Sequence, residues 1–455
     1  MSPDTISSVS LKRLALLAGP ILLANLATVS VGTIDTVMVG QRSADELAGV
    51  ALGASIALWI SITFTGILQG LSPLAGYNFG AQTYQDVGRV HQQSWYLALL
   101  FCVPAVVLTR LVDFWVELAD VTPAVGEIAK NYMLYVSWAV PAILLSRVYI
   151  AVNAAVSRPA ATTVVLVTSL LLKIPLNLLM MNGIGQWPGI GGVGVGMATA
   201  ISQWVALFFL VAIWKVDKYY ARMRLKVWER INWSLIGQIL RIGIPMGLAI
   251  FFEIAAFSLM AILIARMGTI ALGAHQIVSN LIWLYYDLPL SVGVAGSVMV
   301  AQNLGRQRPE ESRRAVCMSL KVAGGLGVML AAITWFAQEH IIALYTSDAA
   351  VQQMALSLLS LGIIYHLADA MQCSSNCLLR GYRITVVPMI LHSTLLCGLG
   401  LGLGYYLAAT QPNLGPKSYW ISMSIALWIE AVFMVVFTVI KANARANRPL
   451  WSWRL

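Results

Sequence analysis

Long apolar runs separated by short polar breaks make up most of this sequence. A helix needs about 20 apolar residues to cross a lipid bilayer, and many of the runs reach that length. Reading them between their polar breaks predicts about twelve helices. The first six are predicted at 14–38, 47–72, 94–113, 130–153, 161–182 and 194–214. The second six are predicted at 239–264, 272–300, 315–336, 352–379, 385–408 and 419–440. The pattern indicates an all-α integral membrane protein.

The composition agrees with this pattern. Of the 455 residues, 59% are hydrophobic and 11% are charged, whereas an ordinary soluble domain has about 25% charged residues. A soluble globular protein, a disordered chain and a disulfide-rich scaffold are therefore excluded. The cysteines lie in apolar stretches and form no C-x-x-C pair, which predicts small buried hydrophobic side chains. They are Cys102, Cys317, Cys373, Cys377 and Cys397.

Basic residues outnumber acidic ones, and their positions orient the predicted helices. The chain has 29 Lys and Arg against 19 Asp and Glu, a net charge of +10. With the N-terminus inside, 20 of the 29 basic residues fall in inside segments, as the positive-inside rule requires. They are Lys12, Arg13, Arg89, Arg158, Lys215, Lys218, Arg222, Arg224, Lys226, Arg230, Arg306, Arg308, Arg313, Arg314, Arg380, Arg383, Lys441, Arg445, Arg448 and Arg454. Both termini are then expected to be cytoplasmic.

This layout divides the chain into five parts. They are a cytoplasmic N-terminus 1–13, an N-lobe 14–214 with six helices, a linker 215–238, a C-lobe 239–440 with six helices, and a cytoplasmic C-terminus 441–455. The linker mixes basic and aromatic residues. An anionic membrane surface suits that mixture better than nucleic acid does, so we expect no nucleic-acid partner.

The two predicted lobes are sequence repeats. At a constant offset of 225 residues, identical or similar residues recur in the two halves. The matches include Pro20 with Pro245, Asn78-x-Gly80-x-Gln82 with Asn303-x-Gly305-x-Gln307, Asp86 with Glu311, Arg89 with Arg314, and Arg158 with Arg383. An even number of helices per half makes the repeats parallel, related by a pseudo-two-fold axis along the membrane normal. Two six-helix bundles of this kind, facing a central cleft, are typical of transporters.

A few ionisable residues interrupt the apolar runs. A charge at the centre of a membrane helix costs about 2.5–3.5 kcal/mol on insertion scales, so such residues usually face a wet cavity. We take Asp35, Lys173, Glu253, Asp287 and Asp369 as this set. Functional roles are expected for Asp35, Glu253 and Asp369, and the structural alternative is an interhelical hydrogen bond or charge pair.

Neighbouring residues sharpen these expectations. Tyr365 precedes Asp369 by four positions and shares its helix face, and His366 is placed to join them. Glu253 lies among aromatic and apolar residues. A carboxylate in such a setting can hold a proton, Na⁺ or a cationic ligand in competition, which is the simplest physical basis for antiport. Lys173 is the cation of the set, and its expected partner is Asp35.

Taken in order, several motifs resemble the multidrug and toxic compound extrusion (MATE) family, in its bacterial NorM-like branch. The resemblance covers about residues 10–440. It rests on Leu17-Ala18-Gly19-Pro20, Ile34-Asp35-Thr36-Val37-Met38-Val39-Gly40, Asn78-Phe79-Gly80-Ala81-Gln82, Pro175-Leu176-Asn177, Glu253 and Tyr365-x-x-x-Asp369.

The resemblance implies a V-shaped, two-lobed antiporter of the bacterial inner membrane. It would expel cationic, amphiphilic organic compounds by alternating access, using a Na⁺ or H⁺ gradient. Glu253, Tyr365 and Asp369 would carry the cation site, with Na⁺ possible there, and Asp35 would be a second candidate. No cofactor is implied beyond the coupling ion.

Two positions depart from the family pattern. Relatives usually have a neutral polar residue where Lys173 stands and an apolar one where Asp287 stands. We therefore regard Asp287, Lys173, Asn177 and His366 as possible modulators of coupling. Asp287 lies two residues before Pro289, where it can line the cleft or reach toward the surface.

Two other functions are compatible with a repeated membrane protein. A lipid or lipid-linked saccharide flippase needs several basic residues in its cleft for pyrophosphate, and only Lys173 qualifies. A membrane enzyme needs a catalytic constellation, and neither H-E-x-x-H nor G-x-S-x-G occurs. We therefore expect a non-enzymatic transporter of small organic cations that acts as a monomer in the lipid bilayer.

Overall fold

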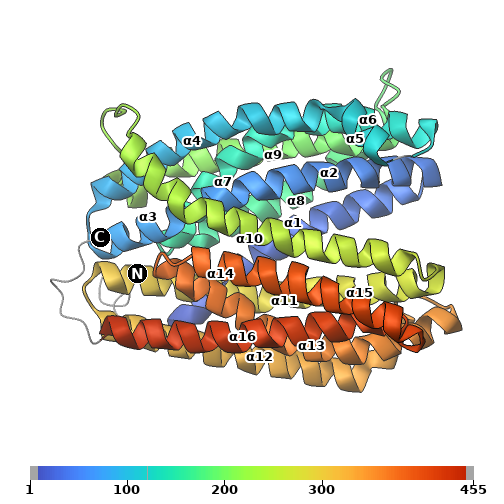
Figure 1. Ribbon diagram of the computed structural model, residues 1–455. Coiled ribbons are helices and arrows are strands. Elements are labelled where there is room, and N and C mark those ends of the chain that lie inside the picture. Colours follow the sequence, from blue (N-terminus) through green and yellow to red (C-terminus); the bar gives the residue numbers. More distant parts are fainter. Residues whose placement is uncertain (1–8, 120, 447–455) are drawn as a thin grey trace. The chain divides into compact units, whose positions relative to one another are not determined.

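The computed structural model describes residues 9–119 and 121–446, and in these the chain is helical (Figure 1). Eleven helices are long and apolar enough to cross a membrane, or twelve if one bent pair counts as a single span. Each predicted apolar run overlaps one of these spans. No β-strand occurs in the described residues beyond an isolated bridge between Ile184 and Trp187. The all-α membrane architecture is therefore confirmed.

The chain forms two compact units, which we call the N-unit and the C-unit. The N-unit is Gly19–Gly247. Its core combines apolar side chains such as Leu68, Leu144 and Ile239. Its elements are most of α1 (Leu11–Gly40), α2 (Ala44–Leu68), α3 (Leu71–Gly80), α4 (Tyr84–Arg110), α5 (Val112–Ala119), α6 (Pro123–Val136), α7 (Ala139–Ala155), α8 (Pro159–Asn182), η2 (Gly191–Val193), α9 (Gly194–Val216), η3 (Lys218–Arg222) and the first part of α10 (Trp233–Ala265).

The C-unit comprises the described residues up to Ala18 and from Leu248 onward. Its core is built on residues such as Met260, Leu358 and Trp420. It contains the first turns of α1, the rest of α10, α11 (Thr269–Gly305), α12 (Pro309–Ala343), α13 (Ala349–Gly381), α14 (Val386–His392), η4 (Ser393–Gly400), α15 (Leu401–Thr410), η5 (Pro412–Leu414) and α16 (Lys417–Ala446). The η4 segment is a π-helix. Together, α14, η4 and α15 make one span whose middle is π-helical and whose two ends are α-helical.

The division between the units falls inside α1 and α10, whereas the predicted lobes placed it in the linker 215–238. The linker is attached to the N-unit by specific contacts. The Gln93 side chain donates to the Arg230 carbonyl and accepts from the Asn232 backbone N–H. The start of α10 is held as tightly, because a Cβ at Gly243 would collide with the Ile67 carbonyl oxygen of α2.

One predicted helix is bent. The expected run 130–153 corresponds to α6 and α7, which meet at 47° across a short break. Pro141 lies in the first turn of α7, where its missing N–H removes no helical hydrogen bond. The sequence therefore begins a new helix here without loss of backbone hydrogen bonding.

The repeated N-x-G-x-Q motif forms the same helix end in both units. Gln82 and Gln307 adopt left-handed backbone conformations, with φ of 62° and 59°. The Asn78 and Asn303 carbonyls each accept the backbone N–H five residues later. This is the Schellman arrangement, which satisfies carbonyls left open at a helix C-terminus. The motif is thus a structural device that ends α3 and α11.

The acid-x-x-Arg part of the repeat is also structural. Arg89 pairs with Asp86 at 2.7 Å, and Arg314 pairs with Glu311 at 2.8 Å. Both pairs span three residues in the first turns of α4 and α12. The acid near each helix N-terminus is also favoured by the helix dipole.

The match of Arg158 with Arg383 does not hold at the level of geometry. The left-handed residues at these helix ends are Ser157 and Arg383, which lie one position off the register of 225. The Asn153 and Leu379 carbonyls accept the closing hydrogen bonds. The offset between the halves is therefore one residue larger at these helix ends than at Gln82 and Gln307.

Candidate functional site

In the N-unit, Asp35 lies between two residues of α8. Lys173 Nζ donates to Asp35 Oδ2 at 2.8 Å, and Asn177 Nδ2 donates to Asp35 Oδ1 at 2.7 Å. Lys173 and Asn177 are four residues apart, so they lie on one helix face. All three side chains are buried. The predicted pairing of Asp35 with Lys173 is confirmed.

The Lys173 ammonium is enclosed by further oxygen atoms. It lies 3.3 Å from the Val195 carbonyl oxygen and contacts the Thr199 hydroxyl, both on α9. Thr199 in turn donates to the Val195 carbonyl at 2.7 Å. The three donor positions of the ammonium are therefore used. This makes a closed ion pair, in which the negative charge of Asp35 is balanced by a cation that is part of the chain.

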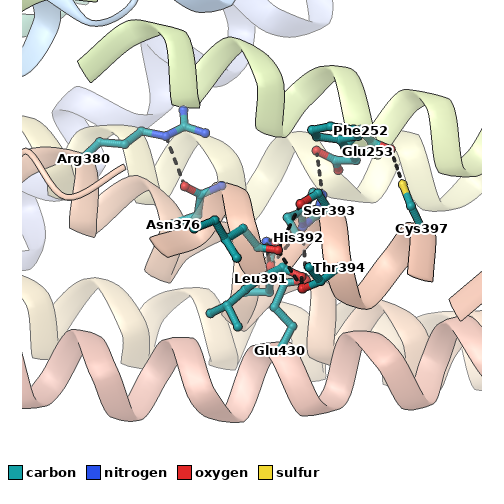
Figure 2. Close-up of polar contacts among 12 residues, drawn as sticks. Phe252, Glu253, Asn376, Arg380, Leu391, His392, Ser393, Thr394, Cys397 and Glu430 are labelled. Atoms are coloured by element: carbon teal, nitrogen blue, oxygen red, sulfur yellow. Dashed lines mark hydrogen bonds and ion pairs between the residues drawn. The ribbon is translucent and has the colours of Figure 1, made fainter. Parts of the chain in front are cut away.

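In the C-unit, a polar cluster of buried side chains and the half-buried Glu253 joins four helical segments (Figure 2). His392, the last residue of α14, lies between Glu253 of α10 and Glu430 of α16. Its Nδ1 is 3.0 Å from Glu430 Oε1, and its Nε2 is 3.6 Å from Glu253 Oε2. The Gln372 amide on α13 donates to Glu430 Oε1 at 2.9 Å. Glu430 is 0% exposed, so this carboxylate depends on its partners for hydrogen bonding.

Asp369 and Tyr365 belong to the same region. Asp369 is buried and lies within electrostatic range of Glu253, His392 and Glu430. Tyr365, one turn earlier on α13, is within range of Asp369 and Glu253. The C-unit thus gathers three acidic side chains near one imidazole, so this cluster holds more acidic groups than basic ones.

Two predicted residues have different surroundings. His366 packs its ring against Tyr285, with centroids 5.3 Å apart, and neither of its ring nitrogens has a hydrogen-bond partner. It therefore makes no hydrogen bond to Asp369, and its ring packs against Tyr285 instead. Asp287 is buried on α11, and its backbone carbonyl accepts the Ser291 hydroxyl.

His392 and Glu430 were missed in the sequence. The expectation that five residues are the ionisable residues of the spans is wrong, since both of these also lie inside spans. The sequence did contain a signal for Glu430, because it is the one charged residue in the apolar run 419–440. The link between His392 and Glu253, which are 139 positions apart, required the fold.

The described acidic residues of the C-unit do not by themselves form a metal site. In the described residues, no group of three His, Cys, Asp or Glu side chains is arranged to hold a metal ion. A Na⁺ at Glu253, Tyr365 and Asp369 therefore depends on the acids and the phenol together, and stays a proposal.

Comparison with known proteins places these sites in a family context. The MatE family model matches residues 20–179 and 245–406, two stretches that begin at the repeat offset. A probable multidrug resistance protein NorM of Aromatoleum aromaticum is 34% identical over 399 residues, covering 87% of this chain and 86% of that protein. Multidrug resistance protein MdtK of Yersinia pestis is 31% identical over 435 residues, covering 94% of this chain and 95% of that protein.

Solved structures show the same fold. The crystal structure of the eukaryotic MATE transporter AtDTX14 aligns with a TM-score of 0.85 and 21% identity, covering 96% of this chain and 98% of that one. An outward-facing multidrug resistance MATE family transporter of the MOP superfamily aligns with a TM-score of 0.87 and 17% identity, covering 96% and 97%. The architecture expected from the motifs is therefore confirmed.

Proposed function

Because this chain belongs to the MatE family, in its NorM-like branch, we propose that it exports cationic, amphiphilic organic compounds across the bacterial inner membrane in exchange for Na⁺ or H⁺. The names of its relatives, which describe multidrug resistance, support the drug-export part. Membership of a family of transporters also favours a non-enzymatic role. The proposal includes alternating access by a monomer in the bilayer, with small organic cations as substrates and with no nucleic-acid partner or cofactor. It also places both termini in the cytoplasm; the terminal residues 1–8 and 447–455 lie outside the described residues.

The observation that carries the coupling part is the excess of acid in the C-unit. Among the described residues, His392 is the basic group that forms ion pairs with Glu253 and Glu430 and lies in electrostatic range of Asp369. Buried carboxylates without matching cations are costly, so they gain free energy by binding a proton or a metal cation. We assign the exchangeable cation to Glu253 and Asp369, with Tyr365 beside them.

Asp35 has a different place in the proposal. Its carboxylate is already neutralised by Lys173 and bonded by Asn177. Removing one partner of a buried pair costs about 3–5 kcal/mol. An external cation would have to displace a tethered ammonium against that cost, so we propose that Asp35 is secondary to the C-unit in coupling.

The same pair weighs against a flippase. A pyrophosphate-binding cleft needs basic groups that are available to the ligand. Lys173, the basic residue on which that alternative depends, is 0% exposed and occupied by three oxygen partners. The alternative therefore lacks its phosphate-binding cation.

The test is export by the purified protein in proteoliposomes loaded with the fluorescent cation ethidium. A Na⁺ gradient at uniform pH and a pH gradient at uniform Na⁺ are applied separately. We expect one of them to drive ethidium movement, and movement under neither gradient contradicts the proposal.

Substitutions then test the site. Glu253→Gln and Asp369→Asn should each reduce gradient-driven export by about tenfold or more. A neutral amide can neither take up and release a proton nor offer a negative charge to a metal cation. Asp86→Asn, which removes an exposed acid of α4, is the matched control and should retain export. Full coupling in both site variants would remove these residues from the mechanism.

A further inference from the structure

His392 stands where the helical span of the C-unit changes its geometry. It is the last α-helical residue of α14, and the next eight residues, Ser393–Gly400, form a π-helix. π-helical segments are rare, are mostly single turns, and often occur at functional sites. This unusual backbone directly follows the residue that lies between Glu253 and Glu430 (Figure 2).

One side of the His392 ring is anchored. Nδ1 lies 3.0 and 3.2 Å from the two oxygens of Glu430, and it is 3.1 Å from the Gln372 amide nitrogen. Gln372 also donates to Glu430. Nδ1 donates to Glu430 of α16, and the Gln372 amide of α13 holds that carboxylate in place by donating to the same Oε1 atom. All three side chains are buried, where such bonds are costly to lose.

The other side of the ring is aimed at Glu253. His392 Nε2 has no hydrogen-bond partner although it is buried, and its nearest acid is Glu253 at 3.6 Å. A buried ring nitrogen without a partner calls for an explanation. Its neighbourhood is acidic, since Asp369 on α13 is also in electrostatic range, and Cys397 of η4 lies nearby. The ring therefore presents its unused nitrogen to the carboxylate that we assigned to the coupling cation.

We propose that His392 and Glu430 are positioning residues for Glu253: Glu430 fixes the imidazole, and the imidazole fixes the orientation of the Glu253 carboxylate for cation binding. This rests on the proposed function. It extends the site from α10 and α13 to two further helices. They are α14, which carries His392, and α16, whose Glu430 acts on the cation only through His392.

Residues that orient a cation-binding group can be recognised by their effect on cation affinity. Changing a residue that orients a metal-binding group typically costs about 10–100-fold in cation affinity. A residue with a purely structural role lowers the amount of folded protein, and leaves the cation affinity of the folded fraction unchanged. The half-saturating concentration of the coupling cation is therefore the readout that separates the two roles.

The experiment uses the full-length protein in proteoliposomes, with ethidium as substrate and a concentration series of Na⁺ and, separately, of H⁺. His392→Leu and Glu430→Leu should each raise the half-saturating cation concentration by about tenfold. Glu430→Gln should come within a few-fold of the wild type, because the amide oxygen can still accept from Nδ1. The double variant His392→Leu/Glu430→Leu should be no worse than the single variants, since Glu430 acts through His392.

Folding is monitored by thermal melting and by ethidium binding. The control is His275→Leu, which removes another buried imidazole of the C-unit, hydrogen-bonded to Ser279 and packed on Trp420. It should leave the half-saturating cation concentration unchanged. Values close to the wild type in folded His392→Leu and Glu430→Leu, or effects that multiply in the double variant, would overturn the proposal. Absence of any gradient-driven export by the wild type would instead reject the proposed function.

Discussion

The two units place buried carboxylates in opposite electrostatic situations. In the N-unit, Asp35 faces a lysine ammonium at 2.8 Å and an amide at 2.7 Å. In the C-unit, Glu253, Asp369 and Glu430 share one imidazole. The first arrangement is balanced by the chain itself. The second holds more acidic groups than basic ones, and we propose that a proton or a metal ion binds there.

This difference matters because both units descend from one repeat. The helix ends at Gln82 and Gln307 and the ion pairs at Asp86 and Glu311 are retained on both sides. The ionisable residues of the interior have diverged. Repeated backbone devices therefore preserve the architecture, and we propose that a few interior charges decide which unit can exchange an ion.

The largest expected effect concerns the closed pair. Lys173→Met should lower the free energy of unfolding by about 3–5 kcal/mol, because Asp35 is left buried without its cation. Thermal melting in detergent measures this loss. Asp35→Asn combined with Lys173→Met should recover most of it, since neither buried charge remains. A single variant as stable as the wild type would contradict the closed ion pair.

A smaller effect concerns the left-handed residues that end α3 and α11, a feature that the two units share. Gln82→Gly and Gln307→Gly should each stabilise their unit by about 1 kcal/mol, because a left-handed conformation is strained for residues with a Cβ. The gains should be similar, since the two φ values are similar. Gln69→Gly is the matched control: Gln69 ends α2 with a φ of −62°, so glycine there should not stabilise. Unequal gains would show that the repeat ends differ.

The smallest effect concerns the ion pair between Arg158 and Asp217 in the N-unit. Arg158 Nη1 donates to Asp217 Oδ2 at 2.5 Å, and its guanidinium lies over the Tyr219 ring. The Tyr219 backbone N–H, followed by the charge of Arg158, lowers the pKa of Asp217. The resulting stabilisation is present above the unfolded pKa of about 3.9 and is lost as pH falls through the folded value.

Asp217→Asn should therefore destabilise at pH 7 by less than about 1 kcal/mol, as is usual for exposed pairs. The deficit should shrink as the pH falls toward the folded pKa of Asp217, which lies below its ordinary value. Melting at pH 7 and pH 3, with Arg158→Gln to complete a double-mutant cycle, measures it. A deficit independent of pH would exclude the ion pair as its cause.

The helical spans were predictable from the sequence because each bilayer-spanning run is continuous and apolar. The bend between α6 and α7 was not, because the two helices lie within one apolar stretch. The Asp35–Lys173 pair could be inferred because few opposite charges are available in the N-terminal half. His392 could not be joined to Glu253 and Glu430, because contacts between distant helices depend on rotations that periodicity does not fix. The place of His366 against Tyr285 was unpredictable for the same reason.

The central claim is that the coupling cation binds the acids of the C-unit and not Asp35. The most direct test compares gradient-driven ethidium export by two variants with the wild type: Asp35→Asn/Lys173→Met, which removes the N-unit pair without leaving a net charge, and Glu253→Gln. The account predicts that the double variant stays within a few-fold of the wild type, while Glu253→Gln loses about tenfold or more. Loss of coupling in the double variant, with coupling retained in Glu253→Gln, would contradict it.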